Sequence, residues 1–228
     1  MRSILIWGSG GLALALGAVG LFLIAPPAKP DFGGGKQLID FVQADEHIRG
    51  NAQASVVLVE YGDFECPACK SYVPMLEQLK QEFGDRVAFV YRHFPLRSIH
   101  PNANSAAQAA EAAALQGKFW EMHDMLFEKQ EEWAKNQNPE ELFEEYAALL
   151  ELDLEQFREA MRSDEVRDRV EDDFQSAVRH GLSSTPTFFL DGVSIASTDI
   201  RGYQAFRSLI EQALQKYNGN EPAPTEIE

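Results

Sequence analysis

The stretch from Ala54 to Cys69 reads ASVVLVEYGDFECPAC, and its pattern decides the fold. Ala54 to Tyr61 contains four consecutive apolar residues, three of them valine, which predicts a short strand buried on both faces. The sequence C-P-A-C then begins at Cys66, and proline is favoured at the first position of a helix. We therefore expect a strand, a tight connection, and a helix that begins at two closely spaced cysteines.

The segments that follow predict an α/β fold with a parallel crossover. From Pro67 to Phe83, apolar residues recur at steps of three and four, as on a helix with one buried stripe. Gly84 and Asp85 end that helix, and Arg86 to His93 (RVAFVYRH) has the composition of a second strand. A strand, a helix and a strand in one sheet imply a right-handed crossover.

The rest of the chain predicts a helical insertion followed by a hairpin and a last helix. Every periodic segment from about residue 103 to 180 has helical spacing. Asp191-Gly192 then lies between two short apolar runs and favours a two-residue hairpin turn. The predicted elements are helices at 103–115, 118–133, 140–150 and 154–178, strands at 187–190 and 193–196, and a helix at 201–217.

The N-terminal segment predicts a membrane anchor at residues 1–28. No ionisable side chain lies between Arg2 and Lys29, and Ile4 to Ala25 as a helix would be about 33 Å long, enough to span a bilayer core. The alternative is a cleaved signal peptide, whose apolar region is normally shorter, and Pro26 after the best cleavage point opposes that alternative. Either way we expect the folded body outside the cytoplasm.

Composition and charge bound the function. The 228 residues are 45% apolar, which is typical of a folded globular chain, and carry 20 basic against 36 acidic side chains, a formal charge of -16. That charge excludes nucleic acids as expected partners. We expect a linker at 29–37, one folded domain at 38–217 and a disordered tail at 218–228.

The two cysteines, Cys66 and Cys69, indicate redox chemistry. A helix N-terminus stabilises a thiolate, so Cys66 is the expected nucleophile and Cys69, one turn further, its resolving partner. A static disulfide around so short a loop would add little stability, and a zinc site would need ligands beyond one C-x-x-C. Glu60, six residues before Cys66, either relays the proton of Cys69 or is a solvated acid at the strand end.

These residues resemble the DsbA-like thiol-disulfide oxidoreductases over about residues 50–217, which implies a thioredoxin fold with an inserted helical subdomain. The resemblance implies that Cys66 is the exposed nucleophile, Cys69 its buried partner and Glu60 the buried acid. It also implies that Pro186 is a cis-proline facing the disulfide, although base rates alone favour trans, and that Thr185 pairs with extended substrates. Pro74 resembles the kink proline of the first helix.

Two positions near the cysteines depart from the strongly oxidising members of that family. The residues between the cysteines, Pro67 and Ala68, are expected to tune the redox potential, and Ala68 stands where strong oxidants carry a histidine. Glu65 places a negative charge beside Cys66, which is expected to raise the pKa of its thiol. The direction of electron flow therefore stays open at this point.

Other polar and aromatic groups are assigned no site. His93, His100 and His123 lack ligand spacing, so we expect no metal, and thiol exchange requires no cofactor. The aromatic and methionine cluster at 119–127 is expected to be core, and the acidic run at 140–145 a solvated helix face.

The resulting expectation is a membrane-anchored, extracytoplasmic enzyme that forms disulfides in exported proteins. By resemblance its partners are thiol-containing protein substrates and a DsbB-like membrane oxidant. The alternatives are a disulfide reductase or isomerase, and an anchored peptide-binding module in which the cysteines have no catalytic role.

Overall fold

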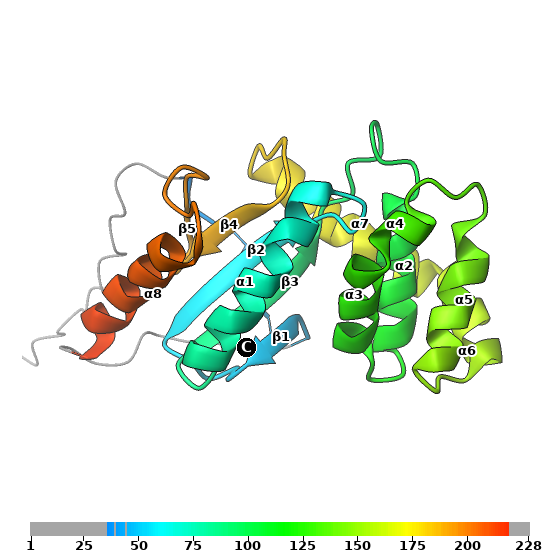
Figure 1. Ribbon diagram of the computed structural model, residues 1–228, viewed down its shortest axis with the longest axis horizontal. Coiled ribbons are helices and arrows are strands. Elements are labelled where there is room, and N and C mark those ends of the chain that lie inside the picture. The colour runs from blue at the N-terminus through cyan, green and yellow to red at the C-terminus, as the bar shows by residue number, and fades with distance from the viewer. Residues whose placement is uncertain (1–35, 39, 44, 219–228) are drawn as a thin grey trace, which may run out of the picture. The chain divides into compact units, whose positions relative to one another are not determined.

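A five-stranded mixed sheet organises the domain in the computed structural model, which describes residues 36–38, 40–43 and 45–218 (Figure 1). The strands follow the order β1-β3-β2-β4-β5 across the sheet. Their bounds are β1 His47–Gly50, β2 Val56–Gly62, β3 Val87–His93, β4 Thr187–Leu190 and β5 Val193–Ser194.

The central strands pair as the crossover predicts. β2 and β3 run parallel, with Val56 opposite Val87 and Glu60 opposite Tyr91, while β4 is antiparallel to β2 and places Phe188 opposite Glu60. The helix α1 (Pro67–Phe83) connects β2 to β3 and contains Pro74. The predicted strands therefore begin within two residues of the observed ones.

Two helices cover one face of the sheet and one helix covers the other. α1 and α8 (Tyr203–Asn218) pack on the face that carries Leu58 and Phe188, whereas α7 (Asp164–Arg179) packs on the face that carries Val59 and Phe189. Alternate residues of a strand point to the same face, so Glu60 points with Leu58 toward α1. The sheet thereby carries Glu60 underneath the helix that begins at the cysteines.

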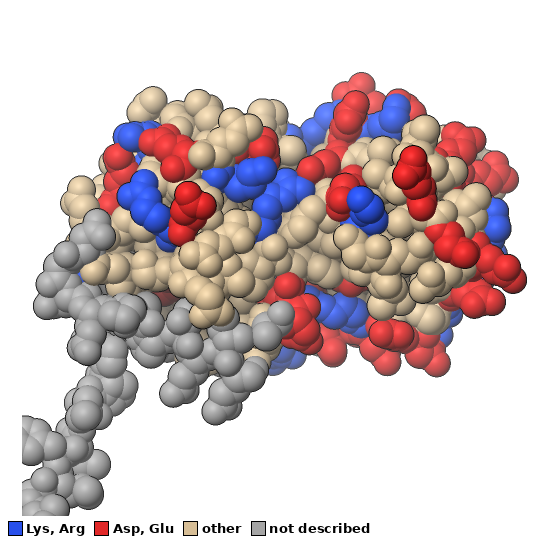
Figure 2. Space-filling model, turned by 90° about the horizontal axis from the view of Figure 1, so that it is seen from below, with Lys and Arg blue, Asp and Glu red and all other residues tan. Residues whose placement is uncertain are grey.

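The helical insertion lies between β3 and β4, as predicted, and packs around an alanine-rich helix. α2 buries seven alanines and contacts four other helices, because small side chains allow close approach. Figure 2 shows acidic side chains spread over the insertion. Its helices are α2 Ala103–Ala114, α3 Phe119–Glu128, α4 Gln130–Trp133, α5 Pro139–Leu149, α6 Leu154–Arg162 and α7.

Several predicted elements differ from the structure. The helix predicted at 118–133 breaks at Lys129, and the one predicted at 154–178 breaks at Ser163, whose side chain caps α7 by accepting from Val166 N. The second hairpin strand ends at Ser194 rather than at residue 196. β1 was not predicted, because its sequence HIRG has no apolar run and the strand lies at the sheet edge.

The two ends of the chain were assigned features that fall largely outside the described residues. The anchor predicted at 1–28 and residues 219–228 of the tail predicted at 218–228 are not described, whereas Asn218 is the last residue of α8. Within the described ranges no helix has the length and apolarity to cross a bilayer. Lys36 and Gln37, expected in the linker, instead join the sheet: Gln37 bridges to Val193, and Lys36 N donates to Ser194 Oγ.

Candidate active site

The turn after β2 places the two cysteines at the start of α1. Cys66 N donates to Asp63 O, and Cys66 is the N-cap of α1 with extended backbone angles, so that Pro67 and Ala68 begin the helix at the surface. The Cys66 side chain is 7% exposed, whereas that of Cys69 is 0% exposed, and both are free thiols. Both cysteines are buried, and Cys66 is the more accessible of the two.

The surroundings of Cys66 stabilise its thiolate. Hydrogen bonding from the Cys69 thiol, with further donors on Thr185 and the backbone of the first helical turn, lowers the pKa of Cys66 to about 5 against the opposing effect of burial. The neutral Cys66 thiol donates to the backbone oxygen of Thr185 (3.4 Å). The buried hydroxyl of Thr185 has no hydrogen-bond partner among the described residues, so it can donate to the Cys66 thiolate. A nucleophilic sulfur is thus present at neutral pH.

Cys69 has the opposite environment. Burial raises the pKa of Cys69 well above its ordinary value, and the negative charges that develop on Glu60 and Cys66 raise it further. The only donor to its sulfur within the described part of the chain is Asp63 N, at 3.5 Å. Cys69 therefore stays protonated until a base takes its proton.

Glu60 lies beneath the helix start, 8% exposed. Burial, followed by repulsion from the Cys66 thiolate, raises the pKa of Glu60 to about 8. Glu60 also lines a cavity of about 50 Å³ together with Val73, Tyr91 and Trp120, and a volume of that size admits water. The burial of Glu60 disagrees with a solvated acid at the strand end. A carboxyl group with a pKa near 8 can accept and return a proton near neutral pH, so the relay remains a prediction.

The peptide bond between Thr185 and Pro186 is cis, which agrees with the family resemblance and not with the base rate. The carbonyl oxygen of Thr185 accepts a hydrogen bond from the Cys66 sulfur. The strand β4 begins two residues later, at Thr187. The structure therefore brings Cys66, Cys69, Glu60, Thr185 and Pro186 together around one helix end.

The carboxylate of Glu65, which was predicted to raise the pKa of the Cys66 thiol, is directed toward the start of α2. It accepts a hydrogen bond from Asn102 N (2.7 Å), and the pKa of Cys66 is lowered despite the adjacent acid. Burial raises the pKa of Glu65 itself. Ala68 stands where strong oxidants carry a histidine, but Cys69 and Thr185 still supply hydrogen-bond donors to Cys66.

Two side chains that the sequence analysis missed hold the active-site turn. Asp63 accepts from Glu65 N, Leu96 N and His100 Nδ1 at 2.7–2.8 Å, and so ties the turn to the segment after β3. Gln130 of the insertion donates to the carbonyls of Phe64 (2.6 Å) and Cys66 (3.1 Å). The pattern D-x-E-C marks Asp63 as a turn residue, but no local pattern points to Gln130.

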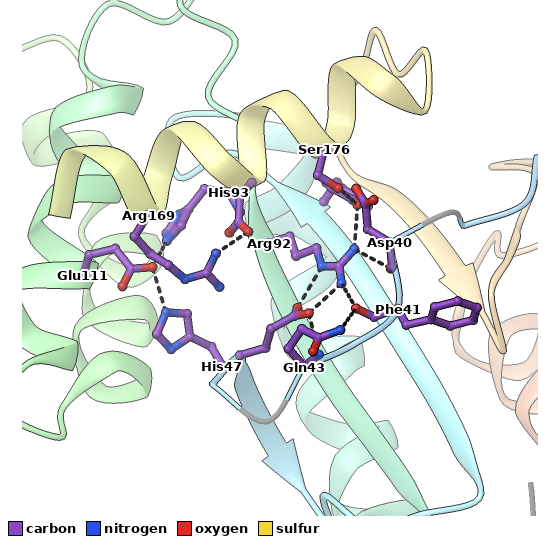
Figure 3. Close-up of polar contacts among 12 residues, drawn as sticks. Asp40, Phe41, Gln43, His47, Arg92, His93, Glu111, Arg169 and Ser176 are labelled. Atoms are coloured by element: carbon purple, nitrogen blue, oxygen red, sulfur yellow. Dashed lines mark hydrogen bonds and ion pairs between the residues drawn. The ribbon is translucent and has the colours of Figure 1, made fainter. Parts of the chain in front are cut away.

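His93, His100 and His123, to which no site was assigned, do not converge, but a different set of side chains does. His100 contacts Asp63, and His123 contacts Asp124. His93 of β3 and His47 of β1 both contact Glu111 of α2 (Figure 3). These last three residues offer ligand atoms within 4.8 Å of one another, a donor set of the kind that holds a metal ion. The aromatic and methionine cluster at 119–127 belongs to the core, as expected.

Comparison with known proteins places this geometry in a family. A family model described as thioredoxin matches residues 43–212. The chain is 42% identical over 178 residues to the Na(+)/H(+) antiporter NhaA 1 of Mycolicibacterium vanbaalenii and 41% identical over 186 residues to that of Mycolicibacterium gilvum. Those matches cover 76% and 79% of this chain but only 28% and 29% of the antiporters, so the chain spans less than a third of these relatives.

Solved structures give the same fold. BdbD from Bacillus subtilis in its oxidised form superposes with a TM-score of 0.66 at 24% identity, covering 75% of this chain and 93% of BdbD. DsbA2 from Pseudomonas aeruginosa gives a TM-score of 0.61 at 25% identity, covering 78% and 99%. The family match, the DsbA-type neighbours and the C-x-x-C site agree on thiol-disulfide oxidoreductase chemistry in general. The chain belongs to the thioredoxin family and has the DsbA-like form of that fold, with a helical insertion.

Proposed function

We propose that this protein is a membrane-anchored, extracytoplasmic thiol oxidase that forms disulfides in exported proteins. The observation that carries the proposal is the stabilised thiolate of Cys66 at the start of α1, with a pKa lowered to about 5. Stabilising the thiolate stabilises the reduced dithiol relative to the disulfide, and a disulfide whose reduced form is favoured is a strong oxidant.

The reaction begins with the Cys66–Cys69 disulfide. A substrate thiolate attacks the Cys66 sulfur, because this sulfur is the accessible one, and the electron pair of the broken S–S bond leaves on Cys69. We propose that Glu60, whose charge acts on Cys69, protonates the departing Cys69 thiolate. The products of this step are a mixed disulfide on Cys66 and a Cys69 thiol.

A second substrate thiolate completes the exchange by attacking the substrate sulfur of the mixed disulfide. The electron pair leaves on Cys66, where the donors at the helix start stabilise it. The substrate has lost two electrons and gained a disulfide, and the enzyme is left as the dithiol. We propose that the backbone beside the cis Thr185–Pro186 bond holds the extended substrate during both attacks, because it lies against Cys66.

Turnover requires removal of two electrons and two protons from the dithiol. We propose a quinone-linked membrane oxidant similar to DsbB as the acceptor. The uncharged stretch from Ile4 to Ala25 supports a position at the membrane, since it is long enough to span a bilayer core. The antiporter activity named for the curated relatives is not carried over, because the chain matches under a third of their length.

The test is the reduction potential of the Cys66–Cys69 pair. The full-length chain, purified in detergent, is equilibrated against glutathione mixtures and its free thiols are counted, with Cys66→Ser as the control that cannot form the disulfide. We expect a value near that of strong oxidants, about -120 mV. A value near that of thioredoxin, about -270 mV, would overturn the oxidase proposal in favour of a reductase.

A cellular assay separates the enzyme from a peptide-binding module. Cys66→Ser is expected to fold and to lose disulfide formation in exported proteins. Full function in that variant would contradict any redox role.

A further inference from the structure

A buried cluster of His47, His93 and Glu111 lies outside the active site. It draws one side chain each from β1, β3 and α2, and so joins the sheet to the helical insertion (Figure 3). Nε2 of His47 lies 2.7 Å and Nε2 of His93 lies 2.8 Å from the same oxygen, Oε1 of Glu111. The redox mechanism uses none of these groups.

Glu111 shares the positive charge of nearby Arg169 with Asp173, which is ion-paired with that guanidinium. Glu46 pairs with Arg92 at 2.6 Å, and Asp173 pairs with Arg169 at 2.5 Å. Glu111, 5% exposed, is then hydrogen-bonded only to the two imidazoles within the described part of the chain. A buried carboxylate requires a compensating positive charge, which is either a proton on an imidazole or a bound cation.

The spacing of the three donors suits a metal ion. Two ligand atoms at about 2.1 Å from a common tetrahedral ion lie about 3.4 Å apart. The two N···O distances here are 2.7 and 2.8 Å, and all three ligand atoms lie within 4.8 Å of one another, so the side chains would have to move apart by roughly 0.6 Å to hold an ion between them. The His47 ring is already fixed in place by stacking on Phe119, with ring centroids 3.4 Å apart.

The geometry points to a site for one divalent transition-metal ion of the zinc class, bound by Nε2 of His47, Nε2 of His93 and a carboxylate oxygen of Glu111. Two imidazoles and one carboxylate are a donor set for such ions, and three protein ligands leave a coordination position for water. This inference is independent of the proposed oxidase function.

Two groups in and beside the cluster affect how tightly it would bind a metal ion. Among the described residues, one buried terminal nitrogen of Arg169 has no hydrogen-bond partner, and its N–H can donate to a metal-bound water, although its charge opposes the added cation. Buried Nδ1 of His93 likewise has no acceptor in the described part of the chain for its N–H in the metal-bound form. A missing outer-shell partner weakens metal affinity by about 10- to 100-fold. We therefore expect binding weaker than at a structural zinc site with a complete outer shell.

The experiment is a titration of the full-length chain, without a polyhistidine tag, with Zn²⁺ by calorimetry and with Co²⁺ by visible absorption. The active-site disulfide is closed beforehand so that neither cysteine can act as a ligand. We expect one equivalent of each ion to bind. The Co²⁺ spectrum is expected to show ligand-field bands without a thiolate charge-transfer band.

Variants locate the ion. Glu111→Gln and His47→Gln are each expected to weaken binding at least tenfold, with folding verified by circular dichroism. His47→Gln keeps the assay usable if the buried Glu111→Gln variant does not fold, because His47 lies at the sheet edge and is partly exposed. His123→Gln, which alters a buried histidine outside the cluster, is the matched control and is expected to bind as the wild type does.

Either of two results would overturn the proposal. One is the absence of a bound equivalent in the wild-type protein at neutral pH, which would leave a proton as the only cation in the cluster. The other is equal affinity in the wild type and in folded His47→Gln, which would place the ion elsewhere.

Discussion

The sulfur of Cys66 lies 3.4 Å from the carbonyl oxygen of Thr185, a residue 119 positions further along the chain. This contact joins the start of α1 to the segment before β4, and it sets both the chemistry of the thiol and the place where a substrate backbone would lie. A neutral thiol donates to that carbonyl, whereas a thiolate turns instead to the donors around it, among them the Thr185 hydroxyl.

Replacing Thr185 by valine is expected to raise the pKa of Cys66 by about one unit. The substitution removes one hydrogen-bond donor to the thiolate, and a hydrogen bond to a charged group contributes about 1.5 kcal/mol, close to one pKa unit. Thiolate absorbance at 240 nm against pH measures the change. Thr187→Val is the control, because that hydroxyl donates to Ser184 O and not to the sulfur. Equal shifts in the two variants would refute the assignment.

The stability of the reduced protein relative to the oxidised protein is expected to rise between about pH 5 and pH 9. Cys66 has a pKa of about 5 in the folded dithiol, against about 8.5 in an unfolded chain, so the unfolded state binds more protons across this interval. This gain in stability is complete above the pKa of Cys66 in the unfolded chain and is lost as the pH falls through its pKa in the folded dithiol. Urea unfolding of both redox forms of the wild type measures it. Cys66→Ser exists only without the disulfide, and its free energy of unfolding should lack this rise with pH.

Glu60→Gln is expected to stabilise the oxidised protein at pH 9 and to have a much smaller effect at pH 5. In the dithiol protein the pKa of Glu60 is raised to about 8, mainly by burial, and the same burial raises its pKa in the oxidised protein. The oxidised wild type is therefore destabilised progressively as the pH rises above the unfolded value, about 4.3. The amide removes the buried charge that causes this penalty. Glu77→Gln is the control, because hydrogen bonds and nearby cations lower the pKa of Glu77 and its removal should give no stabilisation. A Glu60→Gln effect that is independent of pH would contradict the buried-acid assignment.

Gln130→Leu is expected to lower the free energy of unfolding by about 1–3 kcal/mol. The substitution keeps the side chain similar in volume but leaves the carbonyls of Phe64 and Cys66 without their donor in a buried site. Urea unfolding of the oxidised protein measures the loss. Gln175→Leu is the control, since that amide makes an exposed contact with Glu171 within α7. Similar stabilities for both variants and the wild type would show that Gln130 does not hold the turn.

Local patterns in the sequence predicted the parts of the fold that depend on neighbouring residues. The apolar run of β2, the proline after Cys66 and the Asp191-Gly192 turn each specify their own structure within a few residues. Breaks inside helical runs were harder to predict, because Ser163 caps a helix in the middle of a segment whose spacing stays helical on both sides.

The parts that the sequence did not predict depend on contacts between distant segments. Glu111 meets His47 across 64 residues and His93 across 18, and Gln130 reaches Cys66 across 64, so no spacing along the chain marks these pairs. The cis bond before Pro186 was expected only through the family resemblance. Edge strand β1 forms by pairing with β3, and its own sequence does not indicate a strand.

The hydrogen bonds from Gln130 have a consequence for protein engineering. A C-P-A-C motif transplanted into a thioredoxin domain without the insertion would lack the amide that holds the two carbonyls at its turn. The insertion would therefore have to be transplanted with the motif, and a chimera should exchange the segment from β2 to α7 as one block rather than the tetrapeptide alone.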